Sequence, residues 1–307
     1  MYKALISPVH MIRKNLSNYA KYFDESKYFV TSGHYSISEL SMLANPTNDK
    51  SKRLILSSND IKVLVHVSNN FFTFLFQEFA SIALFYSKII NRNIKLYIYL
   101  GSSKHPNFDS SLAKFLFNYL DNINVNYEVI TSAEFEEIEI NKFYFLQSGF
   151  SGFTTNVLYS KTKKLVSNKD TIPFRKVFVG RKDFLQQRID DSKEIEDFFI
   201  KQGFEVVYPE DFINFIDQIN YFSECKVLAG ISGSALSNLV FMKSGGVVIE
   251  LSSLFEISNP ETPIEIHDFY RIASMYRGHL YFSVSNVSAK AKDLMSNHEA
   301  KKFIEML

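Results

Sequence analysis

The chain has 307 residues and a hydrophobic fraction of 46%, enough for two domains that each bury a core. Its 34 basic and 33 acidic residues leave a net charge of +1, and no nucleic-acid-binding motif is present, so nucleic acid is not an expected partner. The single cysteine, Cys225, excludes an internal disulfide and fits a reducing compartment, and no Cys and His cluster has metal-ligand spacing.

Short β-rich runs alternate with helical patterns through the first half of the chain. The predicted strands are residues 3–7, 27–32, 53–58, 62–68, 95–101, 127–131 and 142–148. The main predicted helices cover residues 70–90 and 110–121. Continuous apolar strands separated by helices are typical of a parallel sheet covered on both faces.

The segment of residues 71–90, FFTFLFQEFASIALFYSKII, is long enough to be mistaken for a membrane span. It contains Gln77, Glu78 and Lys88, which are costly in the middle of a bilayer, so the sequence predicts a buried amphipathic helix instead. The N-terminal MYKALISPVH has too short an apolar run for a signal peptide. We therefore expect a cytoplasmic protein, with peripheral contact at the inner face of a membrane left open.

The alternation restarts after a polar stretch, residues 160–174, which is rich in Lys and Ser and predicts an interdomain linker. The later predicted strands are residues 175–180, 204–208, 226–230, 247–251 and 279–285. The later predicted helices are residues 192–203 with Gly203 as the stop signal, residues 211–225, the segment after Gly233, and residues 288–307. Two doubly wound domains joined by a linker predict ligand binding beyond the carboxyl ends of the strands.

The turn Ser232-Gly233-Ser234-Ala235 joins one of these strands to a predicted helix. The opening N–H groups of a helix attract anions, and glycine lets an anion come close to the backbone. Ser232 and Ser234 add hydroxyl groups, so a diphosphate fits the chemistry of this turn. The alternative is an ordinary strand-to-helix turn in which a serine caps the helix.

Residues 176–251 carry an ordered set of motifs around this turn. They are Arg181, Arg188 with Asp190 and Asp191, Gly203-Phe204, Pro209-Glu210, Gln218, Gly230 through Asn238, Phe241 and Glu250. Their order and spacing resemble the C-terminal half of the family-61 glycosyltransferases. Residues 68–78 lie where that family has an Asn-aromatic-aromatic-His segment opening a helix. Thr73 stands at the position of that histidine, and Ser232 replaces the histidine of the family's His-Gly-Ala segment.

The resemblance implies a GT-B architecture, in which two Rossmann-like doubly wound α/β domains face a cleft. Residues 1–165 would form the acceptor-side domain, residues 166–290 the nucleotide-sugar-binding domain, and residues 291–307 a helix that crosses back. It also implies an inverting transfer without a metal or another cofactor, from a UDP-linked sugar to a glycan or lipid-linked glycan. The expected pathway is bacterial surface polysaccharide synthesis, such as capsule or lipopolysaccharide.

The candidate nucleotide-sugar site extends beyond the turn. Arg181 and Arg188 are expected to neutralise the leaving diphosphate, although each could instead be a surface arginine paired with a nearby aspartate. Glu250 is expected to accept the ribose hydroxyls, with an exposed strand-end residue as the alternative. The backbone at Tyr208 and Pro209 would read the base. Asn238 would contact the ligand, with a helix-surface position or a helix-to-sheet hydrogen bond as the alternative.

An inverting transfer also needs a base that takes the acceptor proton. The candidates are His10, His34, Glu78 and His105, and the sequence does not choose among them. Two other functions stay open. The two missing histidines favour a binding module for nucleotide-sugars or glycans that has lost catalysis, and the donor could be a CMP-linked acid sugar.

Overall fold

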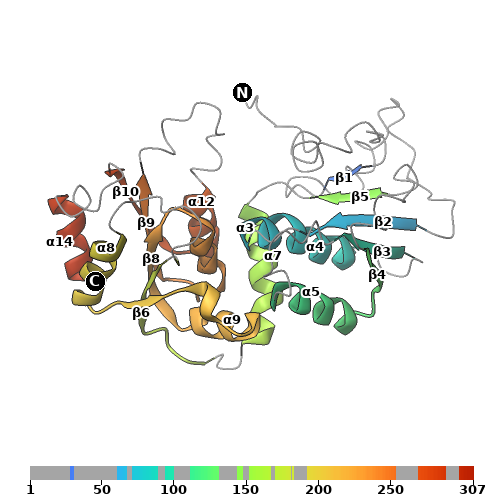
Figure 1. Cartoon of the computed structure of the whole chain (residues 1–307), viewed down its shortest axis with the longest axis horizontal. Helices are drawn as coiled ribbons and strands as arrows, with labels where there is room; N and C mark the ends of the chain where they lie inside the picture. Colours follow the sequence, from blue (N-terminus) through green and yellow to red (C-terminus); the bar gives the residue numbers. More distant parts are fainter. Residues whose placement is uncertain are drawn as a thin grey trace. The chain divides into compact units, whose positions relative to one another are not determined.

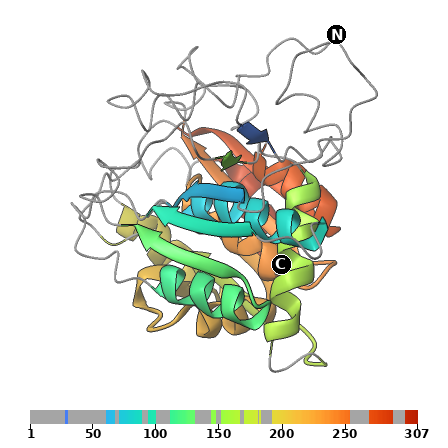
Figure 2. The ribbon, with the colours of Figure 1, turned by 90° about the vertical axis from the view of Figure 1, so that its right-hand side faces the viewer.

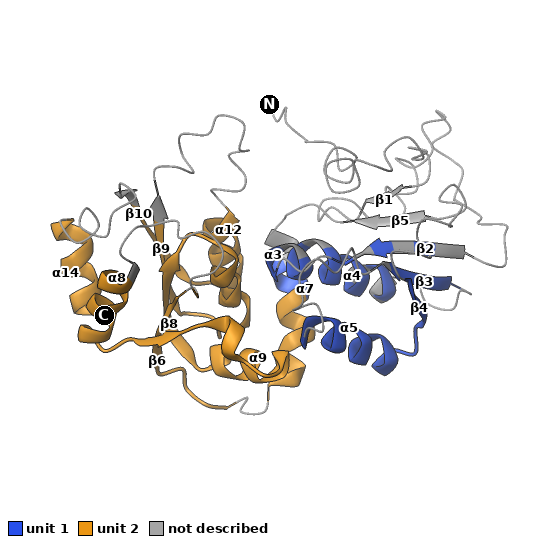
Figure 3. Ribbon diagram, viewed as in Figure 1, with its two compact units in different colours: residues 1–157 blue, residues 158–307 orange. Residues whose placement is uncertain are grey.

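The structure is a computed structural model, and it divides the chain into two compact units, residues 1–157 and residues 158–307 (Figures 1 and 3). It describes residues 28–30, 61–67, 71–88, 94–99, 111–130, 144–147, 152–166, 170–180, 182, 192–253, 269–287 and 297–307. Within these described residues, each unit contains one five-stranded sheet in which every pairing is parallel.

The first unit has the strand order β1-β5-β2-β3-β4. Its strands are β1 (Tyr28–Val30), β2 (Ile61–His66), β3 (Ile94–Tyr99), β4 (Asn126–Ile130) and β5 (Tyr144–Gln147). Its helical segments are α3 (Phe71–Thr73), the π-helix η3 (Phe74–Phe79), α4 (Ala80–Lys88) and α5 (Ser111–Asn122). Figure 2 shows β2, β3 and β4 side by side. The strand order β4-β3-β2-β5 is that of one half of a Rossmann fold, and the direction of winding reverses between β2 and β5.

The apolar segment after β2 is a buried helix, as its composition predicts. Phe74, Leu75, Phe76 and Phe79 are fully buried, and Glu78 is also largely buried. In the part of the chain that the structure describes, no helix combines the length and the hydropathy needed to cross a bilayer.

The second unit has the strand order β10-β9-β8-β6-β7. Its strands are β6 (Arg175–Val179), β7 (Glu205–Val207), β8 (Cys225–Ile231), β9 (Val247–Ser253) and β10 (Leu280–Val287). Its helical segments are η6 (Lys163–Leu165), α8 (Ser192–Lys201), η7 (Pro209–Asp211), α9 (Phe215–Ser223), the 3₁₀-helix η8 (Ser234–Phe241), α12 (Phe269–Arg277) and α14 (His298–Met306). This is the flavodoxin-like order, in which the direction of winding reverses between the first and third strands, here β6 and β8.

The core of the second unit forms where α8 packs against its sheet. Ile195, Phe198 and Phe199 recur at helical spacing on one face of α8 and are buried. The ring of Phe199 lies 4.5 Å from that of Phe178 on β6 and 5.0 Å from that of Phe204. Gly203 between α8 and β7 has a φ of 79°, which confirms it as the residue that ends the helix.

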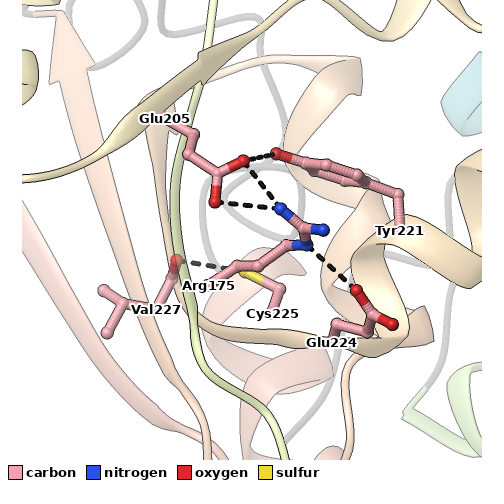
Figure 4. Close-up of polar contacts among 6 residues, drawn as sticks. All are labelled: Arg175, Glu205, Tyr221, Glu224, Cys225 and Val227. Atoms are coloured by element: carbon pink, nitrogen blue, oxygen red, sulfur yellow. Dashed lines mark hydrogen bonds and ion pairs between the residues drawn. The ribbon is translucent and has the colours of Figure 1, made fainter.

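A charged network joins the starting ends of three strands in this sheet (Figure 4). Arg175, which begins β6, donates to both carboxylate oxygens of Glu205 at 2.9 and 3.0 Å and to Glu224 at 3.0 Å. The Tyr221 hydroxyl donates to Glu205 at 2.7 Å, and burial is the main cause that raises the pKa of Tyr221. The thiol of Cys225, which begins β8, has a raised pKa because it is buried, as expected of a core residue.

The structure differs from the sequence-based prediction at three helices. The predicted linker begins in α7 (Gly152–Thr162), and Thr162 and Val166 are buried, so this stretch is not an extended polar connection. The helix α12 was not predicted. The segment after Gly233 is a 3₁₀-helix rather than an α-helix. The predicted strands 3–7 and 53–58 lie outside the described residues.

Candidate functional site

The candidate site lies at the carboxyl edge of the second unit's sheet, beside the point where the winding reverses. Val179, the last residue of β6, is in register with Gly230 of β8. The turn after β8 and the loop after β6 therefore start from adjacent strands. In doubly wound sheets this is the position where ligands bind.

Two glycines allow close packing at this edge. A Cβ atom on Gly230 would lie 2.4 Å from Cγ2 of Val179, and one on Gly180 would lie 2.6 Å from Cε1 of Tyr208. Contacts this short are not tolerated by real Cβ atoms, so larger residues would push β8 or Tyr208 away. The small residues at these two positions are explained by packing within the protein.

The serine cap of the alternative interpretation is wrong, because Gly233 is the residue that precedes the helix. Gly233 has extended backbone angles, φ 160° and ψ 173°, and no side chain caps η8. The first turn is closed by the N–H of Leu236, which donates to the Gly233 carbonyl at 3.0 Å. The N–H groups of Ser234 and Ala235 precede that bond, and no hydrogen bond within the described residues satisfies them.

Hydrogen bonds from two other elements fix the turn. The Tyr270 hydroxyl on α12 donates to the Gly233 carbonyl at 2.6 Å, and this bond is buried. The N–H of Ser232 donates to the Leu251 carbonyl of β9 at 2.9 Å. The turn is thus held in one conformation before any ligand arrives, so binding there would not have to order it. Sequence reasoning missed Tyr270, which lies 37 residues from Gly233.

Asn238 holds η8 against α9. Its side-chain oxygen accepts from Nε2 of Gln218 at 2.7 Å, and its Nδ2 donates to the Ala235 carbonyl at 2.7 Å. Asn238 is fully buried. This geometry favours the structural alternative for Asn238. It also explains why Gln218 and Asn238 occur together, because the buried Asn238 oxygen and the Gln218 Nε2 group satisfy each other.

Tyr208 follows β7 with its ring beside Gly180. Its hydroxyl donates to Oε2 of Glu196 on α8 at 2.8 Å. The ring is partly exposed at the same sheet edge as the turn. Glu196, which sequence reasoning did not single out, therefore orients the side chain of Tyr208, whose backbone was predicted to read a base.

Glu250 is 2% exposed and lies inside β9, which continues to Ser253. The expectation that it ends the strand is wrong, and so is the alternative of an exposed strand-end residue. Glu250 is in register with Gly230 on one side and Ser283 on the other. Tyr281, two residues before Ser283 on the same face of β10, donates its hydroxyl to the Glu250 carboxylate.

Several predicted site residues cannot be compared with the structure. Arg181, Arg188, His10, His34 and His105 all lie outside the described residues. Glu78 is described, and it lies within the π-helix η3, in the helical stretch that follows β2 as the sequence predicts. Such π-helical segments are often found at functional sites, but Glu78 is 7% exposed.

The buried side chains of Arg277 and His279 hold the C-terminal end of η8. Nη2 of Arg277 donates to the Met242 carbonyl at 2.9 Å, and Nε2 of His279 lies 3.2 Å from the Leu239 carbonyl oxygen. Burial, and then the nearby charge of Arg277, lower the pKa of His279 to about 4, although its bond to Leu239 opposes the shift. His279 is therefore neutral near pH 7. Neither residue was singled out from the sequence.

The comparisons with known proteins agree with the resemblance of the motifs. No curated protein sequence matches the chain. The family model for Glycosyltransferase 61 matches residues 65–249, which is more than half of the chain. The match runs from β2 into β9 and includes the turn at Gly233 and the Gln218–Asn238 pair. The chain therefore belongs to glycosyltransferase family 61, whose members transfer sugars.

Proposed function

We propose that this glycosyltransferase takes a sugar from a UDP-linked donor and transfers it, with inversion, to a glycan or lipid-linked glycan. The proposed setting is bacterial surface polysaccharide synthesis in the cytoplasm, at the inner face of the membrane. The two units would act as the two domains of a GT-B enzyme, with the acceptor on the first unit and the donor on the second.

The observation that carries this proposal is the turn at the winding reversal of the second sheet. It offers the N–H groups of Ser234 and Ala235 at the opening of η8, and Tyr270 and Leu251 hold it in place. Backbone N–H groups at a helix start, next to the reversal point of a parallel sheet, suit a donor diphosphate.

The acceptor hydroxyl oxygen would attack the anomeric carbon of the donor sugar while the bond from that carbon to the diphosphate oxygen breaks. UDP leaves with the bonding electrons, and the N–H groups of Ser234 and Ala235 together with Arg181 and Arg188 would stabilise its charge. The acceptor proton would pass to one of the proposed bases His10, His34, Glu78 and His105.

Two further residues would select the nucleotide. Tyr208, oriented by Glu196, would lie beside the base. Glu250, oriented by Tyr281, would accept a ribose hydroxyl. A carboxylate in this role is common in nucleotide-binding sheets.

UDP binding tests the proposal. We expect UDP to raise the Tm of the protein, because a ligand that binds only the folded state stabilises it. Arg181→Ala should remove most of that shift, since losing a charge-assisted bond to phosphate costs about 1.5–3 kcal/mol. Lys201→Ala, which removes an exposed cation from the last turn of α8, is the control and should leave the shift unchanged. An Arg181→Ala protein that binds UDP as tightly as the parent would contradict the assignment.

A second test concerns metal. The proposed scheme neutralises the diphosphate with arginines and helix N–H groups, and Asp190 and Asp191 are adjacent residues before α8 rather than an Asp-x-Asp pair at a strand end. We expect sugar transfer to be the same with and without EDTA. Loss of transfer in EDTA, with recovery on adding Mg²⁺ or Mn²⁺, would refute the metal-free scheme.

A binding module without catalysis is the second candidate, because Thr73 and Ser232 replace two histidines of the family pattern. Release of a nucleoside phosphate from nucleotide-sugars distinguishes the transferase from the binding module. Incubation with UDP-, GDP- and CMP-sugars, with and without glycan acceptors, should release a nucleoside phosphate if the chain is an active transferase. Tight nucleotide binding without release under every condition would favour the binding module, and release from CMP-sugars alone would change the donor.

A further inference from the structure

A cavity of about 280 Å³ opens in the second unit, away from the turn at Gly233. Among its lining residues are Lys163, Lys164 and Lys243, and also Ser223 at the end of α9. Ser223 lies just before β8, whereas the Gly233 turn follows β8. The cavity and the candidate donor site are therefore at opposite ends of the same strand.

The lining of the cavity is positively charged. Lys163 and Lys164 have exposed side chains, and neither forms an ion pair within the described residues. Lys243 donates to the Thr171 carbonyl, which holds its ammonium group in place. None of the described residues that line the cavity is acidic. Because the whole chain has a net charge of only +1, the adjacent Lys163 and Lys164 mark a local concentration of positive charge.

A further cation, Arg277, lies against Tyr159, one of the residues that line the cavity. The ring of Tyr159 lines the cavity, and its centroid lies 5.7 Å from Nζ of Lys163 and 3.3 Å from Cζ of Arg277. Arg277 is 5% exposed, and its Nε has no hydrogen-bond partner. No ion pair to Arg277 exists in the part of the chain that the structure describes, so its charge adds to that of the lysines.

We propose that this cavity binds the phosphate or diphosphate group of an organic ligand, at a site separate from the donor site. Lysine ammonium groups form charge-assisted bonds with phosphate oxygens, and several lysines together match the multiple negative charges of a phosphate or diphosphate. Tyr159, Val166 and Phe241 supply an apolar wall for the part of the ligand that carries the phosphate. The volume exceeds that of a single phosphate group. A soluble phosphate ester and a lipid headgroup share this chemistry.

Calorimetric titration with pyrophosphate at low salt tests the site. The double variant Lys163→Gln/Lys164→Gln should weaken binding at this site by about tenfold, because two charge-assisted contacts are lost. Lys163→Arg/Lys164→Arg keeps the charges and should bind like the parent. The control is Lys301→Gln/Lys302→Gln, an adjacent exposed pair on α14 with the same change of net charge, which should change the affinity less than twofold.

The outcome separates this site from the donor site. The double glutamine variant should bind UDP at the donor site as the parent does, and a Gly233→Val protein should keep the pyrophosphate binding that depends on Lys163 and Lys164. The proposal is overturned if the parent does not bind millimolar pyrophosphate, or if the Lys163/Lys164 and Lys301/Lys302 glutamine pairs weaken it equally.

The source of the phosphate is distinguished with vesicles. Sedimentation with phosphatidylglycerol vesicles, compared with phosphatidylcholine vesicles, measures binding to an anionic headgroup. If the Lys163→Gln/Lys164→Gln protein loses phosphatidylglycerol binding and the α14 control keeps it, the site holds a lipid headgroup. If both proteins sediment as the parent does while pyrophosphate binding is lost, the site holds a soluble phosphate.

Discussion

Gly233→Val is expected to lower the affinity for UDP by on the order of a hundredfold, or about 3 kcal/mol. A β-branched side chain would stand where the phosphate approaches the N–H groups of Ser234 and Ala235. The backbone at Gly233 is extended, so valine meets no left-handed strain there. Calorimetric titration with UDP measures the affinity, and urea unfolding measures the stability of the same protein.

Smaller changes separate the loss of binding from damage to the fold, because Gly233 is buried. Gly233→Ala adds one methyl group and should give an intermediate loss of affinity. Ser234→Ala removes a hydroxyl that caps nothing, so the free energy of unfolding should change by less than about 0.5 kcal/mol. Ser244→Val adds bulk at an exposed turn residue that follows η8 and is the control for valine.

The two interpretations of the turn give opposite results. If it binds phosphate, the affinity for UDP falls more than stability does in Gly233→Ala and Ser234→Ala. If it is only a connection between a strand and a helix, both variants bind UDP like the parent. A UDP-bound crystal structure with its phosphates beyond hydrogen-bond distance of residues 232–235 would exclude the phosphate site.

His279 is expected to make the folded state less stable as the pH falls from about 6.5 to about 4. Burial holds the folded-state pKa of His279 near 4, below its ordinary value of 6.5. Between these values the unfolded chain binds a proton that the folded chain does not, so the free energy of unfolding rises with pH across this window. The contribution of this one residue is about 3 kcal/mol between the two ends of the window.

Urea unfolding at several pH values measures this contribution. His279→Gln removes the titrating group, and it should be less stable near pH 7 because the Leu239 contact changes. Between pH 6.5 and pH 4, the free energy of unfolding of the variant should nevertheless fall less than that of the parent, and the two decreases should differ by about 3 kcal/mol. His298→Gln changes an exposed histidine at the start of α14 and should keep the parent's slope. Equal slopes for the parent and His279→Gln would show that His279 is not held neutral.

The sequence by itself determined the parallel α/β class, most strand positions and the family. These features depend on short-range patterns: apolar runs of strand length, helices between them, and Gly203 at a helix end. It also singled out the turn at Gly233, because a run of very small residues between a strand and a helix is a local signal. The Glycosyltransferase 61 match covers the same motifs, since a family model reads residue types in order along the chain.

Helices without a clear apolar stripe were decided by tertiary contacts. In α7 the small and polar residues of GFTTNVLYSKT give no amphipathic pattern, and Thr162 instead donates to the Leu158 carbonyl at 2.9 Å within the helix. Packing against other elements stabilises such a segment, and that packing is not visible in a local window.

The arrangement of the site was likewise decided by the tertiary structure. Tyr270 meets Gly233 across 37 residues, Tyr281 meets Glu250 across 31, and Gln218 meets Asn238 across 20. Each of these bonds joins two elements whose distance depends on the strand order and on how helices cover the sheet. Residue types along the chain predict which groups have suitable chemistry. Which hydroxyl bonds to a buried carbonyl or carboxylate depends on the folded sheet, because only the sheet brings the two groups together.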